Sequence, residues 1–89
     1  MNFAIAKQAA DELSYAFTES SNALNAFVAS HGGAGQMGLT PDHVKAMPEY
    51  QALKRSFDIA FAALRNFNAM YTKKYKRELA AERAARRAA

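Results

Sequence analysis

Apolar residues recur at alternating steps of four and three along the first third of the chain. The seam at this spacing contains Ala6, Ala10, Leu13, Phe17, Ser20, Leu24, Phe27 and His31, and six of these eight positions are apolar. This spacing places its members on one side of an α-helix, because seven residues make about two helical turns. Asn2 is the predicted N-cap, and the dipeptide Gly32-Gly33 is typical of a helix C-terminus. The sequence therefore predicts one long amphipathic helix over residues 2–31.

A second seam with the same spacing follows in the other half of the chain. It contains Tyr50, Leu53, Phe57, Ala60, Leu64, Phe67 and Tyr71, and none of these residues is charged. Pro48 suits the first position of a helix, where its missing N–H is not needed. The pattern predicts a second long helix from residue 48. Strong helix formers continue from Arg77 to the end of the chain, so the helix is expected to extend beyond the seam.

The segment between the two long helices holds all the glycines of the chain. Residues 32–40 are predicted to form a loop. Thr40 followed by Pro41 is typical of a helix start, with Thr40 as N-cap. Because Pro48 follows closely, residues 41–46 are expected to form one short helix.

These elements predict an all-α fold, an antiparallel helical hairpin with a short intervening helix. Each long helix also carries a second apolar stripe beside its seam: Ile5, Ala9, Ala16, Ala23 and Val28 on the first, and Ile59, Phe61, Ala63, Met70 and Tyr75 on the second. A hairpin alone would leave these stripes exposed. A homodimer that forms a four-helix bundle would cover them, and it is favoured over a monomer because so small a domain buries little surface. The predicted core and dimer seam residues are Leu13, Phe17, Leu24, Phe27, Tyr50, Leu53, Phe57, Leu64 and Phe67.

Charge divides the chain into two parts. Residues 1–72 hold five basic and six acidic side chains, whereas residues 73–89 hold seven basic and two acidic ones. We therefore interpret residues 1–72 as the helical hairpin and residues 73–89 as a basic helical C-terminal extension that projects beyond the packed part. Glu82 and Arg86 are spaced as a favourable i,i+4 ion pair. A helix that is only exposed to solvent and binds no partner would show such a pair as well.

This extension holds the candidate residues for binding a partner or a nucleic acid. They are Tyr71, Lys73, Lys74, Tyr75, Lys76, Arg77, Arg83, Arg86 and Arg87. Basic side chains attract phosphate backbones, and aromatic rings among lysines stack on bases or anchor protein interfaces. Tyr71 and Tyr75 are expected to be partly exposed, because the seam ends there. The competing interpretation is that the cations only complement the helix dipole and keep the helix soluble.

No residue pattern indicates catalysis, a cofactor or a metal. The chain has no cysteine, which excludes a disulfide scaffold and a thiol nucleophile. His31, His43 and Asp42 lack the spacing of a zinc motif. The glycine-rich segment lacks the lysine of a phosphate-binding loop, and no serine lies in a nucleophile motif. We therefore expect a protein that is not an enzyme.

No segment reads as a targeting signal or a membrane span. The longest apolar run, Ile59–Leu64, is far shorter than the roughly 20 residues that a membrane helix needs. The N-terminus lacks the apolar stretch of a signal peptide. The expectation is a cytoplasmic protein without membrane contact.

The overall texture resembles the short helical accessory proteins of lambda-like temperate phages. The features that carry this resemblance are the small size, the absence of Cys and Trp, the opening Met1–Lys7 and the closing Glu78–Arg87. The resemblance implies an accessory protein that redirects the host, or the developmental decision of the phage, through protein contacts in the host cytoplasm.

Together these patterns favour a non-catalytic accessory or regulatory protein that binds a host or phage protein. Two alternatives stay open at this point. One is a nucleic-acid-binding protein that uses the basic C-terminal helix, and the other is a structural or assembly component.

Overall fold

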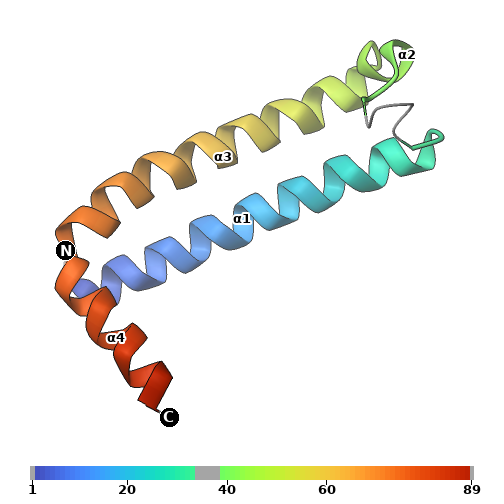
Figure 1. Cartoon of the computed structure of the whole chain (residues 1–89). Coiled ribbons are helices and arrows are strands. Elements are labelled where there is room, and N and C mark those ends of the chain that lie inside the picture. The colour runs from blue at the N-terminus through green and yellow to red at the C-terminus, as the bar shows by residue number, and fades with distance from the viewer. Residues whose placement is uncertain (1, 34–38, 89) are drawn as a thin grey trace.

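The computed structural model describes residues 2–33 and 39–88, and they form two long antiparallel helices with two shorter ones (Figure 1). The helices are α1 (Phe3–Ser30), α2 (Asp42–Lys45), α3 (Pro48–Lys74) and α4 (Lys76–Ala88). The described residues contain no strand. The prediction of an all-α hairpin with a short intervening helix is confirmed.

The ends of α1 follow the capping rules. The Asn2 side chain accepts a 2.9 Å hydrogen bond from the Ile5 amide, as predicted for an N-cap. At the other end, Gly32 and Gly33 adopt φ values of 97° and 76°. These angles lie in the left-handed region, which glycine enters without steric cost. The Gly33 amide donates to the Val28 carbonyl over 2.9 Å, so the last turn of the helix is closed.

The connection to α3 differs in one detail from the prediction. Pro41, not Thr40, is the N-cap residue of α2, with φ −60° and ψ 146°, and no side chain caps this helix. The extended ψ of Pro41 keeps it outside the helix, which then begins at Asp42. Pro48 is the first residue of α3, as predicted. The predicted loop at residues 32–40 includes positions 34–38, which lie outside the described residues.

The two seams face each other along the hairpin. Phe17 meets Phe57 with ring centroids 5.3 Å apart, and Phe3 stacks on Tyr71 at 6.3 Å. The predicted seam residues of both helices are all shielded in part. Leu13, Phe17, Leu24, Phe27, Tyr50, Leu53, Phe57, Leu64 and Phe67 are half-buried. A single pair of helices covers each seam from one direction only, which explains why these large side chains keep some exposure.

The fully buried cluster lies at the end of the hairpin where α1 begins. It contains Ala6, Ala10, Tyr71 and Tyr75, with Phe3, Phe67 and Leu79 packed around it. Small residues of α1 thus pack against large aromatic rings at the end of α3. Val44 of α2, near the opposite end, is also fully buried. The most deeply buried side chains therefore lie near the two ends of the hairpin.

The basic extension does not continue α3, which corrects the prediction of one long projecting helix. The helix breaks at Tyr75, with φ −110° and ψ 30°, and α4 leaves at an angle past the start of α1 (Figure 1). No glycine or proline is present at the break. Upstream, the Thr72 hydroxyl donates to the Asn68 carbonyl over 2.7 Å, a contact that often bends a helix.

Candidate interaction surfaces

The hairpin has two sides of very different character. One side is formed by the residues that precede each seam position by one, and we call it the alanine face. On α1 it contains Ile5, Ala9, Glu12, Ala16, Glu19, Ala23, Ala26 and Ser30, and on α3 Glu49, Ala52, Ser56, Ile59, Ala63, Asn66 and Met70. These two stripes lie on the same side because the helices run antiparallel with their seams facing each other. The face is apolar apart from three carboxylates, two hydroxyls and one amide.

Nearly every side chain of the alanine face is open to solvent. Ile5 is 54% exposed, Ile59 65% and Met70 39%. Ala9 is the member that is half-buried, and the others are exposed. An exposed face on which alanines connect larger apolar side chains is unusual in a soluble monomer and marks a contact site. The sequence prediction that a lone hairpin leaves its flanking stripes uncovered is confirmed for Ile5, Ala16, Ala23, Ile59, Phe61, Ala63 and Met70. It is wrong for Tyr75, which is buried, and holds only in part for Ala9 and Val28, which are half-buried.

The opposite side, which we call the polar face, follows each seam position by one. It contains Lys7, Asp11, Ser14, Thr18, Ser21, Asn25 and Val28 on α1, and Gln51, Lys54, Asp58, Phe61, Arg65, Asn68 and Thr72 on α3. Lys54 and Asp58 form an i,i+4 ion pair at 3.0 Å. Phe61 is 45% exposed, with the Arg65 guanidinium 5.7 Å from its ring centroid. Most side chains of the polar face are therefore charged or polar.

Helix α4 docks on the polar side. The Lys7 ammonium, a polar-face group, lies 2.6 Å from a carboxylate oxygen of Glu82. This hydrogen bond and the Glu82 charge raise the pKa of Lys7 above its usual 10.5. Leu79 packs against the buried cluster. Consequently α4 leaves the alanine face uncovered along its whole length.

The structure separates the candidate binding residues of the extension into two groups. Tyr71 and Tyr75 are buried, at 8% and 6% exposure, so the expectation that they are partly exposed is wrong. Phe3 covers both rings, with its centroid 6.3 Å from Tyr71 and 5.6 Å from Tyr75. Burial also raises the pKa of Tyr71 above its usual 10.0. Neither ring is available to stack on a base.

The basic members of the same prediction remain exposed. They are Lys73, Lys74, Lys76, Arg77, Arg83, Arg86 and Arg87. Lys76, Arg83 and Arg87 are spaced by seven and four residues, so they share one side of α4 with Ala80 between them and no carboxylate among them. We call these three residues the basic stripe. Arg86 instead points to the junction with α1, where it lines a hollow with Lys7, Glu82 and Ala85.

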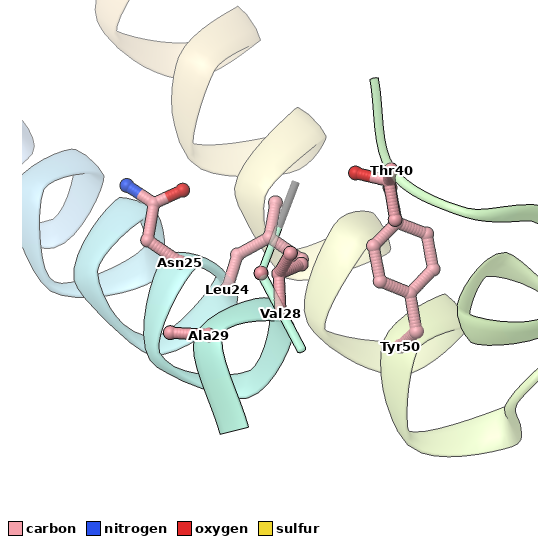
Figure 2. A pocket seen from close by; sticks show the side chains of 7 residues that line it. Leu24, Asn25, Val28, Ala29, Thr40 and Tyr50 are labelled. Atoms are coloured by element: carbon pink, nitrogen blue, oxygen red, sulfur yellow. The ribbon is translucent and has the colours of Figure 1, made fainter. Parts of the chain in front are cut away.

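A second hollow lies near the other end of the hairpin (Figure 2). It is lined by Leu24, Asn25, Val28, Ala29, Gly33, Thr40 and Tyr50. Leu24 and Val28 of α1 point toward Tyr50 and Thr40 across the opening. No charged side chain lines it, so it offers no pair of groups for acid–base chemistry. Across the described parts of the chain, no three His, Asp or Glu side chains gather as a metal site would require.

Helix α1 combines length with apolar character, yet in residues 2–33 and 39–88 no helix meets the length and hydropathy that crossing a bilayer requires. No protein-family model, no curated protein and no solved structure matches this chain. The alanine face and the basic stripe are therefore the features that bear on its function.

Proposed function

We propose that this chain is a small non-catalytic accessory or regulatory protein that works through protein–protein contacts. It assembles as a homodimer and binds a host or phage protein in the host cytoplasm, as its phage-like sequence implies. The observation that carries this proposal is the exposed alanine face. Removing apolar surface from water is favourable by about 25 cal/mol per Å². The alanine face runs along both long helices, so a partner that covers it would bury apolar surface over their whole length.

The test compares two variants that add the same charge to the same helix. Ala16→Glu places a carboxylate in the middle of the alanine face, whereas Thr18→Glu places one on the polar face. Tagged wild-type protein and both variants are used to capture proteins from nuclease-treated bacterial lysate. Wild type and Thr18→Glu are expected to retain the same bound proteins, and Ala16→Glu to lose them. Equal capture by all three, or none by any, contradicts the proposal.

Nucleic-acid binding through α4 is a second candidate, and the basic stripe is the observation that favours it. Three cations on one exposed side of a helix can contact successive phosphates, and each contact adds to a salt-dependent affinity. Truncating the extension is a poor test, because Tyr75 and Leu79 belong to the packed cluster. Point substitutions of the basic stripe leave that cluster intact.

The matched experiment removes three charges at each of two places. Lys76, Arg83 and Arg87 are changed together to Gln, and the control changes Lys45, Lys54 and Arg65 to Gln. Binding of a labelled duplex and a labelled single strand is measured between 50 and 200 mM salt. If α4 is the site, the first variant loses most of its affinity and its salt dependence, and the control keeps both. Equal losses in both variants would instead reflect net charge alone.

A further inference from the structure

The molecule exposes more surface than a folded chain of its mass normally does. Its accessible surface is 6533 Å² for 9.8 kDa. The usual scaling gives roughly 5,200 Å² for a monomer of this size, so the excess is on the order of 1,300 Å². A standard protein interface buries about 800 Å² on each partner. The chain therefore carries enough surplus surface for one full interface.

The shape of the alanine face suits a second copy of itself. Its alanines let another helix approach to the short end of the usual 8–10 Å interaxial range. Ile5 and Met70 lie toward one end of the hairpin, and Ile59 lies near its middle. A flat face of this kind meets an identical face in a two-fold interface, where each residue pair occurs twice.

Charges within and beside the face distinguish between the two ways of stacking the hairpins. The ring pairs Phe17–Phe57 and Phe3–Tyr71 set the levels along the hairpin, and they place Glu19 at the level of Arg55. Glu19 belongs to the face on α1, and Arg55 lies next to the face on α3. If α1 of one copy lies on α3 of the other about a two-fold axis parallel to the helices, Glu19 faces the opposite charge of the second copy's Arg55.

The alternative stacking places α1 on α1 of the second copy, running antiparallel. Centred on the middle of α1, it brings Glu12 of one copy to within about two residues, or roughly 3 Å along the axis, of Glu19 of the other. Like charges at that separation repel each other, and this pairing would occur twice. The carboxylates therefore favour the stacking of α1 on α3.

We propose that a second copy of this chain occupies the alanine face, with α1 of each copy packed antiparallel on α3 of the other. This inference rests on the proposed function, because it names the first partner of the same surface. The resulting four-helix bundle buries Ile5, Ile59 and Met70 and leaves both polar faces, both α4 helices and both basic stripes on its outside.

The first measurement is the mass in solution. Sedimentation equilibrium at about 20 μM is expected to give twice 9.8 kDa for wild type and for Thr18→Glu, and a monomer for Ala16→Glu. A wild-type monomer at this concentration overturns the proposal. A wild-type monomer would also refute the homodimer of the proposed function, but a monomer that still captures another protein would leave the contact with that protein standing. A wild-type dimer that captures no other protein would refute that contact and leave this inference intact, so the two failures are distinguishable.

The second measurement determines the arrangement. Because the chain has no cysteine, each introduced cysteine is the single thiol with which the cross-linker can react. Chains carrying Ala23→Cys are mixed with chains carrying Ala52→Cys and treated with a short bismaleimide. These positions lie at one level on α1 and α3, so cross-linked mixed dimers are expected. A mixture of Ala9→Cys and Ala23→Cys chains serves as the contrast. Those sites are about 21 Å apart along the proposed bundle but close together in the alternative stacking. Cross-linking of this second mixture in place of the first overturns the arrangement.

Discussion

Ala6 is fully buried at the point where three aromatic rings converge on α1, and its small size is what lets them do so. Replacing it with leucine adds three carbon atoms where no space is available. We expect Ala6→Leu to lower the free energy of unfolding by about 1–3 kcal/mol, the usual cost of overpacking. Ala4→Leu, an exposed neighbour on the same helix, is the control and should change little. Urea unfolding followed by circular dichroism measures both, and equal effects would contradict the role of Ala6.

Tyr71 makes stability depend on pH in the alkaline range. Burial favours its neutral form, so its pKa in the folded protein lies above the 10.0 of an unfolded chain. The folded state then holds the proton more tightly, and stability that is fully present below pH 10 is lost as pH rises through the folded pKa. Lys7, whose pKa is raised by its hydrogen bond to Glu82 and by that charge, acts in the same direction above 10.5.

We therefore expect the free energy of unfolding to fall as the pH rises above 10, and Tyr71→Phe to make this fall shallower. Unfolding curves measured at half-unit steps of pH test it. The control is Tyr15→Phe, which alters a ring that is 67% exposed and should leave the fall as in wild type. A wild-type stability that stays constant to pH 12 would contradict the burial of Tyr71.

At single residues, the sequence predicted features that depend on neighbours in the chain and missed those that depend on distant ones. Asn2 was predicted correctly because an N-cap is decided within four residues. The burial of Tyr71 and Tyr75 was missed, because it depends on Phe3 and on the return of α4. One signal was present: the first seam, extended back by three residues from Ala6, includes Phe3 and places it opposite these rings.

At the scale of elements, α4 is held by few contacts. Leu79 packs on the aromatic cluster, and Glu82 pairs with Lys7 at a position where both side chains remain partly exposed. An exposed ion pair contributes little stability, so Leu79 is expected to be the main attachment. Leu79→Asp should release α4 from α1 while the hairpin stays folded.

Hydrogen exchange monitored by mass spectrometry tests this release. In the Leu79→Asp variant, amides of residues 76–88 should lose protection, whereas those in the middle of α1 and α3 should keep it. Ala80→Asp adds the same charge to an exposed side of α4 and is the control. Loss of protection throughout the molecule would mean that α4 is part of one cooperative unit with the hairpin.

The elements themselves were largely predictable, and the reason is periodicity. Both seams repeat at steps of four and three over many turns, and only a helix places such positions on one side. The break at Tyr75 was not predictable in the same way. Lysines precede the break and arginine, glutamate, leucine and alanine follow it, all of which favour a helix, and no glycine or proline interrupts them. The direction of α4 is decided by the tertiary contacts of Leu79 and Glu82, which a local pattern does not contain.

The whole molecule is long and thin, and this shape yields a final prediction about its assembly. Its radius of gyration is 17.4 Å and its extents are 48 × 27 × 17 Å, whereas a compact chain of this length has a radius near 12 Å. Pairing through the alanine face adds a second layer of helices about 10 Å away, so each hairpin centre moves only about 5 Å from the common axis. The radius of gyration then rises to only roughly 18 Å while the mass doubles.

Small-angle X-ray scattering at about 20 μM or above measures both quantities at once. A doubled forward scattering with a nearly unchanged radius is expected for wild type, and a single mass with the same radius for Ala16→Glu. Dimerisation through the ends of the hairpin would instead separate the centres by most of the 48 Å length and raise the radius to nearly 30 Å. That result would place the interface at α4 or α2 and refute the alanine face as the contact surface. The radius of gyration of the assembled particle therefore identifies which of its surfaces the chain uses to associate.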